Sequence, residues 1–341
     1  MPDTPKAFKI AIDAMGGDHA PRAIVEGAVE AARAYPHHLV LVGQTDAIER
    51  ELARLGSRPK NISIRHADSV IGMSESASVS VRRKKDASVC VCADMAKADE
   101  VDAIVTAGHT GAAVAATTLK LRLIEGIDRP GIGIAFPTLK GPSFLIDVGA
   151  NIETKPIHYL QYAVMGDVYF RSILGKRNPT VGILNIGEED SKGTEIIKEA
   201  RKLLEKSKLN FIGNVEGRDI FNGKVDIIVC DGFVGNVVLK VAESIVDVIG
   251  QLLKKNLKKN YMTMVGALLS KPAFKALKRE VDYTEYGGAP LLGIDGICII
   301  SHGSSNPNAI KNAIRVAGEF AQGRINERIL QEARLLKGLT A

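Results

Sequence analysis

Residues 225–239 read Val-Asp-Ile-Ile-Val-Cys-Asp-Gly-Phe-Val-Gly-Asn-Val-Val-Leu and join an apolar run to a helical pattern through a glycine turn. The β-branched run ends at Asp231-Gly232 and helical spacing starts after Gly235-Asn236, so the stretch predicts a strand, a tight turn and a helix. The free N–H groups and the dipole of a helix N-terminus bind phosphate or another anion, and glycine lets the ligand approach the backbone. We therefore predict an anion site at this turn.

A second copy of the same pattern begins 124 residues earlier and has residues 106–111 as its turn. Two copies of one turn design indicate that a single site is built from both. The matching positions are Val101 with Val225, Asp102 with Asp226, Ile104 with Ile228, Val105 with Val229, Gly108 with Gly232, Gly111 with Gly235 and Val114 with Val238.

Strands and helices alternate along the rest of the chain. The spacing predicts strands over 8–13, 39–42, 62–65, 131–136, 144–148, 181–184 and 297–300. It predicts helices over 22–35, 46–55 (with Asp46 and Glu49 as a capping pair), 157–174, 237–259 and 307–330, and residues 74–99 are mostly helical in pattern. Such alternation is typical of an α/β fold with a mostly parallel sheet covered on both faces, and ligands bind such folds at the carboxyl ends of the strands.

Several further turns combine glycine with polar side chains, at residues 13–21, 147–151, 287–293 and 301–306. Another, at residues 185–193, carries Lys192 between glycines and beside two carboxylates, which can hold the lysine in place. A lysine held in this way is a good partner for phosphate or for a developing oxyanion.

The motifs of several other enzyme classes are missing from the sequence. Gly-x-Gly-x-x-Gly does not occur, and the nearest P-loop-like run, residues 217–224, has the wrong glycine spacing. There is no His-x-x-x-His, Cys-x-x-Cys or Gly-x-Ser-x-Gly, which argues against zinc and against a serine hydrolase. We therefore expect neither a metal nor a cofactor. The four cysteines, expected to be buried reduced thiols, are Cys90, Cys92, Cys230 and Cys298.

Composition indicates a globular protein. The 341 residues are 45% hydrophobic and 25% charged, and no apolar run reaches the roughly 20 residues of a membrane span. Residues 1–8 have no apolar core, which argues against a signal peptide, so we expect a cytoplasmic protein.

The net charge of +6 is concentrated in one segment, because residues 252–279 hold eight basic residues and no acidic one. Such a cluster attracts an acidic partner or an anionic membrane surface, and we expect no nucleic acid. Between its lysine-rich parts lies an apolar tip, residues 261–269, which either packs in a dimer or the core, or dips into a lipid interface. The tip residues that we expect to make this contact are Met262, Met264, Val265, Leu268 and Leu269.

The turns together carry a family resemblance. Ile12-Asp-Ala-Met-Gly-Gly-Asp-His-Ala-Pro21 resembles the opening signature of the PlsX family, the acyl-ACP:phosphate acyltransferases of bacterial phospholipid synthesis. Later blocks of the family follow in order at 107–112, 147–151, 185–189, 231–236, 287–293 and 302–305, so the resemblance covers essentially the whole chain. His109 departs from the pattern, in which we expect asparagine.

The resemblance implies a single catalytic domain, residues 1–341, with a three-layer, doubly wound α/β fold similar to phosphotransacetylases and to isocitrate and isopropylmalate dehydrogenases. A basic helical hairpin over residues 237–280 would project from it and contact the partner of a homodimer, the membrane, or both. The implied reaction moves a long-chain acyl group from acyl-ACP to inorganic phosphate. The acyl phosphate then feeds a membrane-bound glycerol-3-phosphate acyltransferase, with the enzyme associated peripherally with the inner face of the cell membrane.

Residue pattern and resemblance together define a candidate site. The candidate catalytic residues are Lys192 and Asn236, which would position phosphate and stabilise the oxyanion, and His302, which could assist the leaving thiol. The candidate phosphate- or substrate-binding residues are Asp13, Gly16, Gly17, Gly108, His109, Thr110, Gly111, Asp147, Asn151, Asn185, Glu188, Asp231, Gly232, Gly235, Gly288 and Ser304.

Two alternative functions stay open at this point. A phosphotransacetylase that uses acyl-CoA would need a pocket for an adenine nucleotide, and no segment of the sequence indicates such a pocket. A non-catalytic scaffold for lipid enzymes at the membrane surface would explain the basic hairpin but would leave the glycine turns without a role.

Overall fold

The structure is a computed structural model that describes residues 6–56, 58–281 and 287–336. Its strands are β1 Lys9–Asp13, β2 His38–Gly43, β3 Ile62–His66, β4 Ala103–Thr106, β5 Gly131–Phe136, β6 Ser143–Ile146, β7 Thr180–Leu184, β8 Asn210–Val215, β9 Ile227–Val229, β10 Ala289–Leu292 and β11 Cys298–Ile300. Its helices are α1 Arg22–Ala34, α2 Thr45–Arg54, α3 Ala77–Arg83, α4 Ser88–Lys97, α5 Thr110–Leu121, α6 Pro156–Ile173, α7 Glu195–Glu205, α8 Asp219–Asn222, α9 Gly232–Leu257, α10 Tyr261–Leu269, α11 Lys271–Val281, α12 Pro307–Gly323 and α13 Ile325–Leu336.

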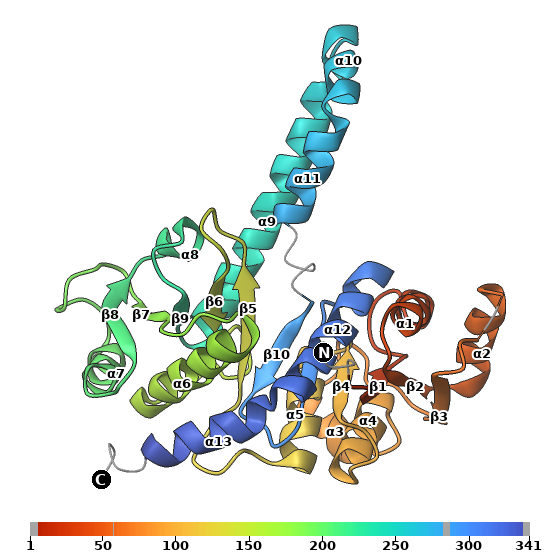
Figure 1. The fold of residues 1–341 in the computed structure, drawn as a ribbon, viewed down its shortest axis with the longest axis horizontal. Coiled ribbons are helices and arrows are strands. Elements are labelled where there is room, and N and C mark those ends of the chain that lie inside the picture. Colours follow the sequence, from red (N-terminus) through yellow and green to blue (C-terminus); the bar gives the residue numbers. More distant parts are fainter. Residues whose placement is uncertain (1–5, 57, 282–286, 337–341) are drawn as a thin grey trace, which may run out of the picture.

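The strands form one mixed sheet in the order β3-β2-β1-β4-β11-β10-β5-β6-β9-β7-β8. The first five strands are parallel to one another, and so are the last four. Three antiparallel pairings, β11 with β10, β10 with β5 and β5 with β6, join these two blocks in the middle (Figure 1). The sheet is therefore mostly parallel, as the alternation of strands and helices predicts.

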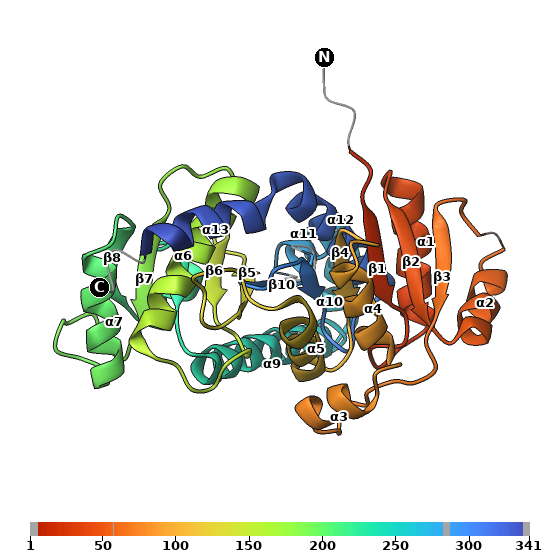
Figure 2. The ribbon, with the colours of Figure 1, turned by 90° about the horizontal axis from the view of Figure 1, so that it is seen from below.

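Helices cover both faces of the sheet, and the strand residues alternate between two apolar cores. In β1, Ile10 and Ile12 belong to one buried cluster together with residues of α1, α6 and α12. Ala11 belongs to a second cluster with residues of α4 and α5. Figure 2 shows α12 and α13 on one side of the sheet and α3, α5 and α9 on the other. The expected three-layer fold is therefore confirmed.

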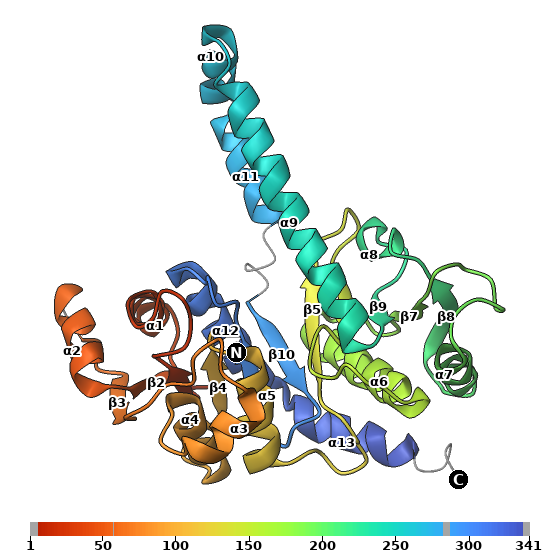
Figure 3. The ribbon, with the colours of Figure 1, turned by 180° about the vertical axis from the view of Figure 1, so that it is seen from behind.

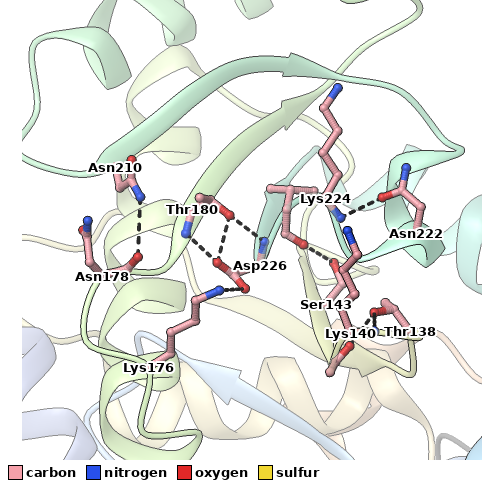
Figure 4. Close-up of polar contacts among 12 residues, drawn as sticks. Thr138, Lys140, Ser143, Lys176, Asn178, Thr180, Asn210, Asn222, Lys224 and Asp226 are labelled. Carbon is pink, nitrogen blue, oxygen red and sulfur yellow. Dashed lines mark hydrogen bonds and ion pairs between the residues drawn. The ribbon is translucent and has the colours of Figure 1, made fainter.

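Both copies of the repeated pattern form a strand, a turn and a helix, as predicted: β4 with α5, and β9 with α9. Their equivalent aspartates have one structural role. Asp102 accepts a hydrogen bond from the N–H of Lys9 (2.7 Å) at the start of β1, and Asp226 accepts one from Thr180 (2.7 Å) at the start of β7 (Figure 4). Each aspartate thus fixes the neighbouring parallel strand, and Lys176 also pairs with Asp226.

Several predicted boundaries are wrong. α9 begins at Gly232 rather than after Asn236, because the Asp231 carboxylate caps the helix by accepting from the N–H of Val234 (2.9 Å). The predicted Asp46 capping pair is also wrong, since the N-cap of α2 is Gln44 and makes no side-chain cap bond.

Two long helical patterns are each interrupted. Residues 74–99 form α3 and α4, which are separated around Lys84, and the last helix ends at Gly323 because Arg324 adopts a left-handed conformation before α13. α7, α8, β8 and β10 are additional elements that the pattern does not predict.

Helices α9, α10 and α11 form a hairpin that projects from the sheet layers (Figures 1 and 3). The five tip residues named above are all exposed, with Met262 at 83% and Leu269 at 77%. The flanking lysines for which burial is described, among them Lys254, Lys255 and Lys271, are exposed as well. Among the described helices, none combines the length and the apolar character that a membrane span requires.

Candidate active site

A pocket that contains several of the predicted site residues lies where the two parallel blocks of the sheet meet. Its volume is about 370 Å³, within the usual range for small-molecule sites. The floor is the face of β5, and the walls come from the first turns of α5 and α12, from α9 and from the turn after β6. The two blocks run in opposite directions, so in a flat sheet their carboxyl ends would lie at opposite edges. The pocket is nevertheless lined by residues that follow β11 of one block and β6 of the other.

In the first half of the chain, Asp13 organises the turns behind the pocket. Its buried carboxylate accepts a hydrogen bond from the Thr106 hydroxyl (2.8 Å), which in turn accepts from the N–H of Gly108 (3.1 Å). A Cβ on Gly16 would lie 2.7 Å from the Gly108 nitrogen, so only glycine fits there. Burial raises the pKa of Asp13, and hydrogen bonds from Ser88 and Thr106 oppose the rise.

In the other parallel block of the sheet, Asp147 directly follows β6 and has an even denser set of contacts. Its fully buried carboxylate accepts from the N–H groups of Ile132 (3.0 Å), Gly149 (3.0 Å), Ala150 (2.9 Å) and Asn151 (2.8 Å). Burial raises its pKa, while these backbone bonds oppose the rise. Its carboxylate oxygens are therefore committed to the turn rather than open to a substrate.

Gly232 and Gly235 are explained by packing of α9 on that same turn. A Cβ on Gly235 would lie 1.9 Å from the Asp147 carbonyl oxygen, and one on Gly232 would lie 2.5 Å from the Asn151 carbonyl oxygen. The Asn151 amide donates to Pro130 and to the Tyr162 hydroxyl, so it is a structural group as well. These glycines allow the helix to approach the backbone turn, which places Asn236 at the pocket.

The polar groups at the mouth of the pocket come from α9 and from the loop after β11. Asn236, Lys240 and Glu243 are spaced at i, i+4 and i+7 and line the pocket from one face of α9. The Lys240 ammonium lies 2.8 Å from Glu243 and 3.1 Å from Nε2 of His302. His302 Nδ1 contacts the Ser304 hydroxyl at 2.7 Å. The chain thus places an amide, a lysine, a carboxylate and an imidazole side by side.

Five of the predicted site residues line this pocket directly, and most of the others lie behind it. The five are Thr110, Gly111, Asn236, Gly288 and His302. Asp13, Gly16, Gly108 and His109 line a small adjoining cavity, and Gly17 packs against Gly303. Asp147, Asn151, Asp231, Gly232 and Gly235 form the support beneath α9.

His109 has a defined role despite its departure from the expected pattern. It is the N-cap of α5, and its Nδ1 accepts from the N–H of Ala112 (3.3 Å). This is the capping bond that asparagine, aspartate or serine usually provides.

Asn185, Glu188 and Lys192 form a separate group on the loop between β7 and α7, outside the lining of the pocket. The Asn185 amide donates to the Lys192 carbonyl (3.0 Å) and so shapes the loop. The expectation that carboxylates of this turn hold Lys192 is wrong, because Glu188 pairs with Lys224 (2.9 Å) and Arg218 (3.5 Å), and Asp190 pairs with Arg201. In the part of the chain that the structure describes, Lys192 makes no ion pair and is exposed. Since β7 neighbours β9, the loop lies on the same edge of the sheet as Asp231.

Lys240, Glu243, Ser301 and Ser305 also line the pocket, although the glycine-turn pattern does not single them out. The signal for the first two is their helical spacing from Asn236, which puts them on one face of α9. The serines flank His302, and only the fold shows that both side chains are buried.

All four cysteines are buried free thiols, as expected. Burial raises the pKa of each of them, for Cys298 to about 12. Because the thiolate is the reactive form, none of these cysteines is activated as a nucleophile. The chemistry of the pocket must therefore use other groups.

Solved structures with a similar fold include two phosphotransacetylases. One, from Streptococcus pyogenes, has a TM-score of 0.63 and 14% identity, covering 93% of this chain and 94% of that chain. The EutD phosphotransacetylase from Staphylococcus aureus has a TM-score of 0.59 and 15% identity, and the match covers 93% of this chain and 95% of that chain. At such identities the likeness concerns the fold alone. The chain is therefore an α/β protein that shares the fold of the phosphotransacetylases.

Sequence comparison is more specific. Residues 8–328 match the sequence model of the family described as "Fatty acid synthesis protein". A phosphate acyltransferase from Geotalea uraniireducens is 50% identical over 325 residues, 95% of this chain and 94% of that protein. One from Heliobacterium modesticaldum is 51% identical over 317 residues, which are 92% of this chain and 94% of that protein. The chain therefore belongs to this family, the PlsX family that its turns resemble, and it is an acyltransferase. This sets aside the non-catalytic scaffold.

Proposed function

We propose that this acyltransferase moves a long-chain fatty acyl group from acyl-ACP to inorganic phosphate and releases acyl phosphate. The observation that carries the proposal is one pocket that Asn236 and Lys240 of α9 line together with the first turns of two helices, α5 and α12. Their dipoles favour an anion, and Lys240 adds a full positive charge. The names of the relatives, phosphate acyltransferases, support phosphate as the acceptor.

The proposed chemistry needs no acyl-enzyme. A phosphate oxygen attacks the thioester carbonyl carbon, the C–S bond breaks, and the thiolate leaves and takes up a proton. Phosphate is already a nucleophile at neutral pH, so the protein need only hold it, partly desolvated, against the carbonyl. A free thiol has a pKa of about 8.5, so it leaves without a strong acid, although His302 lies where it could assist.

We assign the oxyanion of the tetrahedral intermediate to the Asn236 amide, which lines the pocket from α9. Lys192 is assigned as a second donor, which would reach the pocket from the loop after β7, the strand beside β9. Within the described residues no ion pair holds its side chain. Donors aimed at developing charge are usually the largest single contribution to catalysis in such sites.

A trapping assay tests this function. Purified protein, phosphate and long-chain acyl-ACP are mixed, and the product is trapped with hydroxylamine. We expect an acyl hydroxamate that depends on phosphate. Formation from acetyl-CoA but not from acyl-ACP would instead favour the phosphotransacetylase-like alternative, and no hydroxamate from either donor would overturn the acyl phosphate proposal.

The hairpin supports the proposed setting of the reaction. We propose a homodimer, bound peripherally to the inner face of the cell membrane, that passes acyl phosphate to a membrane-bound glycerol-3-phosphate acyltransferase. On α9 the half-exposed side chains Val237, Val241, Ile245 and Val248 line an apolar groove of about 500 Å³ that a second copy could cover. The exposed apolar tip and its lysines suit an anionic lipid surface, and the lysines also suit the acidic surface of ACP.

A further inference from the structure

Two serine hydroxyls in the pocket have no hydrogen-bond partner. Ser301 and Ser305 are only 6% and 5% exposed, and both line the pocket. In the described residues, neither Oγ atom has a partner. Their backbones are fixed, because Ser301 N–H donates to the Thr106 carbonyl (2.8 Å) and Ser305 N–H donates to the His302 carbonyl (2.9 Å). Buried hydroxyls are almost always bonded, so each of these two serines has an unused donor beside the pocket.

The third donor in the same pocket is Lys240. A lysine ammonium has three N–H donors, and here two of them face Glu243 (2.8 Å) and His302 Nε2 (3.1 Å). An ammonium can only donate, so Lys240 directs an N–H to Nε2, while the Ser304 hydroxyl (2.7 Å) and the Ser304 N–H (3.2 Å) contact Nδ1 and fix the ring. His302 and Glu243 therefore orient Lys240 and leave one of its N–H groups for a ligand.

These donors suit a small oxyanion. Ser305 immediately precedes Asn306, the N-cap of the 17-residue helix α12, so the positive end of that helix dipole faces the same place. Asp18 also lines the pocket. A carboxylate repels an oxyanion unless the oxyanion carries a proton that it can donate in a hydrogen bond, and phosphate carries such a proton at neutral pH. Inorganic phosphate combines several acceptor oxygens with such a proton.

We infer that inorganic phosphate binds between the Ser301 and Ser305 hydroxyls, with the third N–H of Lys240 as its charged donor. His302 is then a positioning residue, which acts by holding Lys240. This arrangement rests on the proposed function and gives its phosphate a definite place in the pocket, which the amide of Asn236 also lines.

The test measures phosphate in two independent ways on Ser301→Ala, Ser305→Ala and Lys240→Met. The first readout is the rise in Tm that phosphate produces, which needs no catalysis. The second is the KM for phosphate compared with the KM for the acyl donor. We expect each serine variant to weaken phosphate binding by about tenfold and Lys240→Met to weaken it by about 100-fold. These factors are the scale of losing a neutral and a charged hydrogen bond. The KM for the acyl donor should stay unchanged.

Ser69→Ala is the matched control, because Ser69 Oγ is also buried without a partner but lies outside the pocket lining. It should leave both readouts unchanged. Ser301→Cys and Ser305→Cys keep the size of the side chain with a weaker donor, and they replace any alanine variant that fails to fold. We expect them to weaken phosphate as well.

The outcomes separate this site from the overall reaction. If the wild-type protein makes acyl phosphate but the serine variants keep both the KM for phosphate and the Tm shift, the assignment of the serines is overturned. If the protein makes no acyl phosphate with any donor, yet the variants lose the phosphate-induced Tm shift, the phosphate site stands and the proposed function falls.

Discussion

At the scale of single residues, the aspartates of the turns hold the backbone in place, and other residues present their side chains to the pocket. Asp13 and Asp147 satisfy backbone and hydroxyl donors behind the pocket, while Asn236 and Lys240 present their side chains to it. Both aspartates are buried and follow strands, so their position in the sequence marks the carboxyl edge of the sheet without revealing which groups they bind. For this reason the turn pattern predicts where the site lies but does not predict which residues contact the substrate.

Lys192 gives the first prediction at this scale. We expect Lys192→Ala to lower turnover by a factor of about 100 or more, the effect of removing one oxyanion donor. Steady-state formation of acyl hydroxamate measures it. Lys198→Ala is the control, since Lys198 pairs with Glu195 on α7 and should keep its activity. Full activity in Lys192→Ala would remove this lysine from the site.

Glu75 gives a prediction about pH. Its carboxylate accepts from Lys84 (2.7 Å), Ser80 (2.8 Å) and the N–H of Gly72 (2.9 Å), and the bond from Lys84 does most to lower its pKa, to about 2. A pKa below the usual 4.5 means that Glu75 stabilises the fold above pH 4.5 and loses this contribution as the pH falls toward 2.

Carboxyl-carbon NMR measures this titration directly. We expect a midpoint near pH 2 in the wild-type protein and, in Lys84→Met, a midpoint that moves toward the usual value of 4.5. A midpoint near 4.5 in the wild-type protein would show that these bonds do not persist in solution.

At the scale of elements, strand and helix types follow from the sequence, whereas their ends depend on tertiary contacts. The β-branched run of β9 and the spacing in α9 predict both elements. The helix nevertheless starts at Gly232, where the Asp231 carboxylate caps it, and Gly232 and Gly235 pack on the 147–151 turn, which belongs to a distant part of the chain. A pattern read within a short window cannot include that contact.

Two glycines in α9 test this account. Gly235→Ala would place a Cβ 1.9 Å from the Asp147 carbonyl oxygen, so we expect a large loss of stability, several kcal/mol, on the scale of overpacking and backbone displacement. Gly250→Ala meets nothing within 4 Å, and alanine is the better helix former, so this variant should gain about 0.5–1 kcal/mol. Thermal and urea unfolding compare the two. Equal effects of both substitutions would contradict the packing role of Gly235.

At the scale of the whole molecule, alternation predicts the mostly parallel sheet but not its reversal in the middle. β10, close to the end of the chain, pairs with β5 and β11 and joins the two parallel blocks. β11 follows β10 closely in sequence, but Leu291 of β10 pairs with Ile132 of β5, and local periodicity carries no information about that distant pairing. The pocket forms at this junction, so the sequence predicts the turns that line it and not how they come together.

The projecting hairpin gives the last prediction. Its tip places exposed Met264 and Leu268 between lysine-rich helices, so we expect the protein to float with liposomes that contain anionic lipid and to float less without it. Met264→Glu with Leu268→Glu removes apolar area and adds repulsion, which should weaken binding at least about tenfold. Leu119→Glu with Leu335→Glu adds the same charge at exposed leucines of the sheet layers and should float like the wild-type protein. Size-exclusion chromatography with light scattering completes the test: a change in oligomeric state with unchanged flotation would make the tip a dimer contact rather than a membrane anchor.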